Sequence, residues 1–163
     1  MQSRSVARIR GQAAQMRRIF AEAEGDLASR PVPRSAWCAA EHFDHTIKVA
    51  HSILALLAKP EIAAMPTGIN LIGRVVLAVG WIPRGRGKSP ERLRGAAVTM
   101  DELEAKLAGL EAVIESVAGR TDAPSNIPIV RHPLFGGLTH NQALRFVAIH
   151  THHHLKIVET CLG

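Results

Sequence analysis

The chain of 163 residues is 47% hydrophobic and carries a formal net charge of +6 at pH 7, a size and composition that suit one domain spanning residues 1–163. No apolar run approaches the roughly 18 residues that a membrane span needs. We therefore expect that the chain neither spans a membrane nor has a membrane as its partner. Because the N-terminus also has no hydrophobic segment of signal-peptide type, we expect a cytoplasmic protein.

The first two predicted elements are long helices. A polar, alanine-rich stretch from about Ser3 to Glu24 carries apolar residues at helical spacing, and Gly25 is expected to end it. After a proline-containing connection, Ser35 is the expected N-cap of a second helix, which Pro60 closes. This second helix is apolar around much of its circumference, as expected for a central helix.

The next two predicted elements are a short and a long helix. An apolar run between Thr67 and Gly80 has the composition of a buried strand or a short helix, and we predict a helix because no partner strand is evident. Thr99 and Glu102 form a capping box for a helix that ends near Gly119.

The last predicted helix follows a second capping box, formed by Thr139 and Gln142. Long amphipathic helices without strand signals predict an all-α fold, a four-helix bundle with an additional short helical segment. His132, in the loop before the last helix, is interpreted as a turn residue and not as a ligand.

A basic loop lies between the short helix and the long helix that begins after Thr99. Its cationic residues are Arg84, Arg86, Lys88, Arg92 and Arg94. Because no aromatic side chains alternate with them to stack bases, the loop argues against binding to nucleic acid. It is interpreted as a solvated surface or as a rim that attracts an anionic small molecule, in which case Arg84, Arg86 and Lys88 would bind a cofactor.

Two histidines of the last helix occupy positions where helices normally place core side chains. One stripe at helical spacing contains Ala143, Val147, His150, His154, Ile157 and Cys161. An unpaired buried imidazole costs about 1–3 kcal/mol, whereas imidazoles at i and i+4 can ligate one ion together. We therefore predict His150 and His154 as metal ligands, with His153 in reserve and His152 facing solvent.

The second helix supplies the third predicted ligand, His45, which lies on an apolar line of that helix. His42 and His51 are expected to be surface or boundary residues. Glu41 and Asp44 offer carboxylates as hydrogen-bond acceptors for a ligand's distal N–H, or as proton acceptors in catalysis.

Each of these assignments has a structural alternative. A lone histidine on an apolar helical face is more often a core residue bound to an ordinary acceptor, although neighbouring imidazoles would each need a separate one. Glu41 and Asp44 are expected to be solvated unless they pair with a cation, such as Lys48 at i+4 from Asp44.

The stretch from Trp37 to His45, WCAAEHFDH, resembles a pattern of the DinB-like superfamily, in which a metal-binding histidine follows a tryptophan by eight residues. HTHHHL, which starts at His150, resembles the family's second signature, HxxHHL, and HPLFGGLTHNQ resembles the segment that precedes it in one branch. The resemblance implies a four-helix bundle, often a homodimer, with nickel or zinc held by three histidines. The matching positions are His45, His150 and His154.

The resemblance also implies a chemistry. Relatives include transferases and isomerases that depend on low-molecular-weight thiols such as bacillithiol and mycothiol, and proteins described as metal-dependent hydrolases. Three imidazoles leave an open position at which a metal activates water or a thiol. Ile157 departs from the family, which often has a glutamine there, so a hydrogen bond from that position is missing. The non-enzymatic alternative is a metal-binding or dimerising module without turnover.

Overall fold

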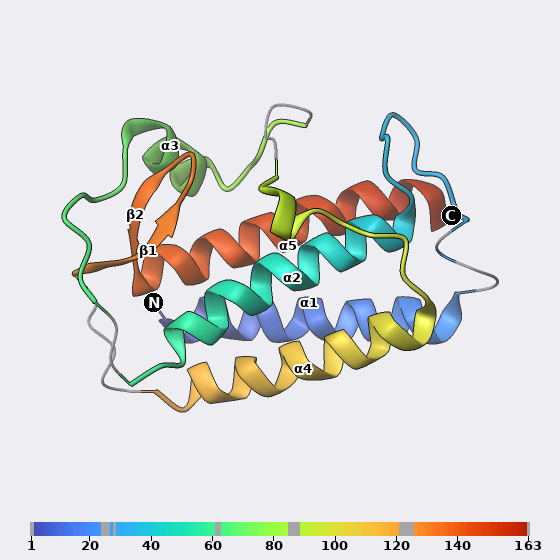
Figure 1. Cartoon of the computed structure of the whole chain (residues 1–163), viewed down its shortest axis with the longest axis horizontal. Coiled ribbons are helices and arrows are strands. Elements are labelled where there is room, and N and C mark those ends of the chain that lie inside the picture. The colour runs from blue at the N-terminus through green and yellow to red at the C-terminus, as the bar shows by residue number, and fades with distance from the viewer. Residues whose placement is uncertain are drawn as a thin grey trace.

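The computed structural model describes residues 2–23, 27, 29–60, 63–84, 89–120 and 126–162. Four long helices lie side by side (Figure 1): α1 (Gln2–Glu22), α2 (Ala39–Leu57), α4 (Met100–Ala118) and α5 (His140–Leu162). The shorter elements are α3 (Leu71–Val79), the 3-10 helix η1 (Glu91–Leu93), β1 (Pro128–His132) and β2 (Gly136–Thr139). The predicted four-helix bundle with an additional short helix is confirmed.

The predicted helix ends are partly correct. α1 ends at Glu22, while Glu24 and Gly25, the predicted end, lie outside the described residues. The prediction that Ser35 caps α2 is wrong, because α2 begins at Ala39. There the Glu41 carboxylate turns back and accepts the Cys38 N–H at 2.8 Å, which pairs the backbone donor of the N-cap residue without Ser35.

Both predicted capping boxes are present. The Thr99 N–H donates to Glu102 at 2.9 Å, and the Glu102 N–H donates to the Thr99 hydroxyl at 3.3 Å. Thr139 and Gln142 make the equivalent pair at 3.0 and 3.4 Å at the start of α5. Each box satisfies backbone donors that the first turn of a helix leaves unpaired.

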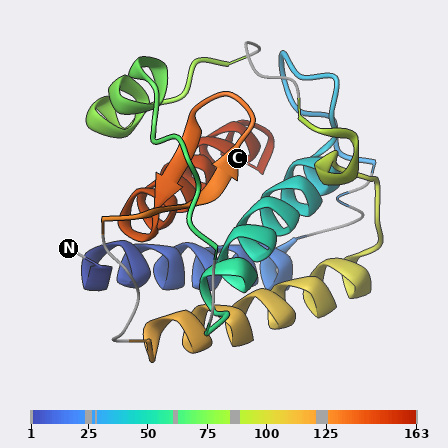
Figure 2. The ribbon, with the colours of Figure 1, turned by 60° about the vertical axis from the view of Figure 1, so that its left-hand side comes forward.

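The antiparallel hairpin of β1 and β2 was not predicted from the sequence. It is short and glycine-rich, and it lies with α3 at one end of the bundle, beside the start of α5 (Figure 2). Gly136 has a φ of 81°, and a Cβ there would lie 2.7 Å from the Gly68 carbonyl oxygen, so glycine is required. His132, predicted as a turn residue, is instead the last residue of β1, and its Nδ1 accepts the N–H groups of Leu134 and Phe135 at 3.2 Å in the turn that follows.

Helix α2 packs against α4 and α5 and, like α1, has these two long helices as neighbours, so it is not more central than the others. Its buried apolar residues lie on several sides of the helix, as its sequence predicted, and they include Phe43, Ile47, Leu54 and Leu57. No helix in the described part of the chain has the length and hydropathy to cross a membrane. The contact between α2 and α5 matters most for function, because both helices carry the predicted ligands.

Candidate metal centre

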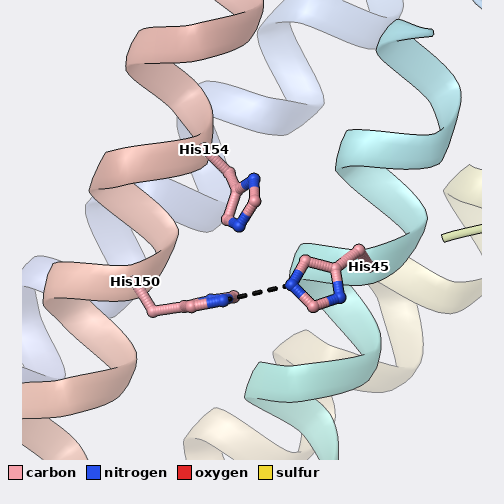
Figure 3. A group of neighbouring side chains, drawn as sticks. All are labelled: His45, His150 and His154. Carbon is pink, nitrogen blue, oxygen red and sulfur yellow. Dashed lines mark hydrogen bonds between the residues drawn. The ribbon is translucent and has the colours of Figure 1, made fainter. Parts of the chain in front are cut away.

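Three imidazoles from α2 and α5 converge between these helices (Figure 3). They belong to His45, His150 and His154, and one ligand nitrogen from each ring lies within 4.8 Å of the other two. The helical spacing of His150 and His154 places both rings on the face of α5 that packs against α2. The structure thus brings together the three side chains that the sequence singled out as ligands.

The separation of the nitrogens suits a metal ion. Nε2 of His45 lies 3.2 Å from Nε2 of His150. Two nitrogens bound to one tetrahedral ion at 2.0–2.1 Å would be about 3.3 Å apart. The 4.8 Å upper bound for the whole group exceeds this spacing by about 1.5 Å, so the three rings would draw closer together around an ion.

The position of the proton on His45 is set by a backbone carbonyl. Its Nδ1 lies 2.6 Å from the Leu93 oxygen, which can only accept, so Nδ1 carries the proton and donates it. Nε2 of His45 therefore directs a lone pair toward His150. A distal hydrogen bond of this kind orients metal-binding histidines, and here η1 supplies the acceptor.

His150 differs from the other two imidazoles at its distal ring nitrogen. Its Nδ1 is buried and has no hydrogen-bond partner among the described residues. Burial, followed by the neighbouring His45, lowers the pKa of His150 well below its ordinary value, and burial likewise lowers the pKa of His154. Both rings are thus neutral near pH 7 and can donate lone pairs to a cation without first losing a proton.

His42 corrects a prediction from the sequence. It was expected at the surface or boundary, yet it is only 4% exposed because α5 and the loop before α2 cover it. Its Nδ1 lies 3.0 Å from Nδ1 of His154, and its Nε2 lies 2.8 Å from the hydroxyl of Ser35. Burial is the main cause that lowers the pKa of His42 to about 4. His51 and His152 are exposed, as expected.

Trp37 covers one side of the imidazole cluster. Its ring centroid lies 5.0 Å from that of His45 and 5.4 Å from that of His42, and it stacks on His154 at 6.5 Å. The half-buried indole therefore limits the access of water from this side. The position of Trp37 just before α2 explains why its sequence spacing to His45 is informative.

The two nearby carboxylates are used elsewhere in the structure. Asp44 is fully buried, and its oxygens accept from Lys48, Lys106 and the Ala96 N–H, so its predicted pairing with Lys48 is confirmed. Glu41 caps α2. The distal nitrogens of His45 and His154 are instead paired with a backbone carbonyl and with an imidazole, and helical periodicity gives no signal for such partners.

The basic loop reaches the cluster at Arg84. Burial is the first cause that lowers the pKa of His42 and of His153, and the positive charge of Arg84 adds to it in both cases. Arg84 is exposed, and its charge acts on both rings. The other two predicted cofactor contacts, Arg86 and Lys88, lie outside the described residues.

Comparison with known proteins adds one finding. A family model described as the DinB superfamily matches residues 7–158. The matched range begins within α1 and ends within α5, so it covers α2, α3 and α4 completely. It includes the three converging imidazoles. No curated protein and no solved structure shows significant similarity to the chain.

Proposed function

The chain belongs to the DinB superfamily, and from this premise we propose that His45, His150 and His154 hold one divalent metal ion, nickel or zinc. The main support is the 3.2 Å separation between Nε2 of His45 and Nε2 of His150. Because Nδ1 of His45 donates its proton to the Leu93 carbonyl, Nε2 of His45 keeps a lone pair that points toward His150. The neutral state of the buried rings adds support, since protons do not compete with the ion near pH 7.

We propose that the site serves a thiol-dependent transferase. An ion held by three imidazoles supplies an open position and lowers the pKa of a bound thiol or water. A free thiol has a pKa of about 8.5, against about 15.7 for water, so it needs less help from a protein base. Both nearby carboxylates, Glu41 and Asp44, are engaged in hydrogen bonds, which favours a thiol over water.

Arg84 supports an anionic cofactor. Arg84 is exposed and its positive charge acts on His42 and His153, so it would attract the carboxylates of a low-molecular-weight thiol such as bacillithiol or mycothiol. Trp37 would exclude water from the side of the cluster that it covers. The proposed division of labour is thus metal binding by the imidazoles, cofactor attraction by Arg84, and shielding by Trp37.

We expect zinc- or nickel-loaded protein to accelerate the reaction of a low-molecular-weight thiol with an electrophile such as an aryl halide or epoxide. The Arg84→Glu variant should raise the KM for an anionic thiol by about tenfold, because it reverses the local charge, with little change in kcat. Arg18→Glu, a charge reversal at an exposed site on α1, is the matched control.

The same assay separates the alternatives. Turnover of activated esters without any thiol would identify a hydrolase and reject the transferase. A protein that binds one ion per chain but turns over neither set of substrates would be a non-catalytic metal-binding module.

We also propose that the chain forms a homodimer through α3. The outward face of α3, here called the α3 face, consists of Leu71, Ile72, Val75, Val79 and the adjacent Trp81, whose exposed fractions range from 53% to 75%. The inward side of the helix is apolar as well, at Leu77. Although Arg74 is a charged, exposed residue of the same helix, the α3 face itself is apolar, and contiguous apolar patches of this kind mark interaction surfaces.

A charge placed in the α3 face should dissociate the dimer. We expect Val75→Glu to convert the protein from dimer to monomer in sedimentation velocity at micromolar concentration, because pairing two copies would bury the carboxylate. Ala108→Glu, an exposed position on α4, should leave the dimer intact. A monomeric wild-type protein would reject the proposal.

A further inference from the structure

A line of hydrogen bonds connects the loop before α2 to the far side of His154. It runs from Ser35 through His42 to Nδ1 of His154. Figure 3 shows that one ring nitrogen of His154 points away from His45 and His150. We propose that His42, anchored by Ser35, is a positioning residue that holds His154 in its metal-binding orientation and tautomer. This inference rests on the proposed metal site.

The hydrogen-bond chain admits two arrangements of protons. In the first, Nδ1–H of His154 donates to Nδ1 of His42, and Nε2–H of His42 donates to the Ser35 hydroxyl. Nε2 of His154 then has a free lone pair. In the second, the Ser35 O–H donates to Nε2 of His42, and Nδ1–H of His42 donates to His154, whose own proton then sits on Nε2.

Only the first arrangement is compatible with a metal ion, because a protonated Nε2 cannot be a ligand. Going from the second to the first moves the His154 proton from Nε2 to Nδ1 and the His42 proton from Nδ1 to Nε2, with no net gain or loss of protons. A metal ion would therefore select the first arrangement, and His42 would supply the acceptor that stabilises it.

The anchor of this chain is held in place by the loop. Ser35 accepts the Trp37 N–H at 3.0 Å, so its hydroxyl oxygen has a fixed position. Arg34 has a φ of 59°, in the left-handed region that non-glycine residues rarely adopt. An isolated bridge between Pro31 and Cys38 closes the loop. Such strain persists only where the surrounding structure imposes it, and it is common at functional sites.

The three imidazoles differ in their support. Nδ1 of His45 has the Leu93 carbonyl, Nδ1 of His154 has His42, and Nδ1 of His150 has no partner among the described residues. His42 and His45 lie one turn apart on α2, so the same helix face supplies one ligand and the support for another. Loss of His42 should therefore loosen His154 and leave His45 in place.

The test compares two replacements of His42. His42→Asn keeps an acceptor near the position of Nδ1, whereas His42→Phe keeps the ring volume and removes the acceptor. We expect His42→Phe to weaken zinc binding in a competition titration by about 10–100-fold, the range for lost outer partners of a metal ligand. His42→Asn should restore binding to within about threefold of wild type. His51→Phe, at an exposed position of α2, is the control.

A second pair of measurements guards against misfolding. Ser35→Ala, a milder change, should weaken zinc binding in the same direction, and the visible spectrum of bound Co²⁺ should change in His42→Phe but not in His51→Phe. Equal zinc affinity in wild type, His42→Phe and Ser35→Ala would overturn the positioning role while leaving the metal site intact. A wild-type protein that binds no ion would overturn the site and, with it, this inference.

Discussion

Replacing His150 with alanine should abolish tight metal binding, with a loss of zinc affinity of roughly 1,000-fold, beyond the 10–100-fold expected for outer partners. Nε2 of His150 lies 3.2 Å from Nε2 of His45, and its loss leaves two ligands, one on each helix. His45→Ala and His154→Ala should behave in the same way.

Thermal unfolding gives an independent measurement of this effect. A ligand that binds only the native state stabilises it by about 2.7 kcal/mol when its concentration is 100 times the Kd. Zinc should thus raise the Tm of the wild type and leave that of His150→Ala unchanged. His152→Ala, an exposed histidine of the same helix, is the matched control and should retain the full shift.

The decisive comparison is the metal content of untagged protein prepared without chelators. Well under one ion per chain in the wild type, or equal content in the wild type and the three alanine variants, would contradict the assignment of the site.

Replacing Asp44 with alanine should lower the free energy of unfolding by about 3 kcal/mol, the lower end of the range for breaking a buried ion pair. The carboxylate is fully buried and lies 2.6 Å from the amines of both Lys48 and Lys106. It also accepts the Ala96 N–H at 2.9 Å. The lower end applies because the two lysines are partly exposed and can be hydrated after the change.

The effect should depend on pH in a defined direction. Burial raises the pKa of Asp44, but the hydrogen bonds from Lys106, Lys48 and Ala96 outweigh it and lower the pKa overall. A lowered pKa in the folded state contributes stability above the unfolded value of about 3.9, and this contribution is lost as the pH falls further. The difference between wild type and Asp44→Ala should therefore shrink below about pH 4.

Asp101→Ala, an exposed acid in the first turn of α4, provides the control in denaturant titrations. A free energy of unfolding for Asp44→Ala within about 0.5 kcal/mol of the wild type, the usual range for surface changes, would show that the buried ion pairs do not stabilise the fold. Because Asp44 holds Ala96, close to the Leu93 carbonyl that orients His45, we also expect a weaker zinc affinity in this variant.

Much of the helical framework follows from local sequence. The capping boxes at Thr99 and Thr139 satisfy donors within one turn of their own helices, so no distant residue is needed to predict them. Helical spacing also indicates which side of a helix faces inward. For this reason His45, His150 and His154 were identifiable before their rings were seen to converge.

The partners of those inward residues depend on the tertiary structure. The carbonyl that orients His45 comes from Leu93, 48 residues away, and Asp44 binds Lys106, 62 residues away. Every residue has a backbone carbonyl, so the pattern of side chains does not indicate which carbonyl will bind a given histidine. His42 was misjudged because periodicity reports the direction of a side chain and not what covers it, and only the packing of α5 and the Ser35 loop made it part of the site.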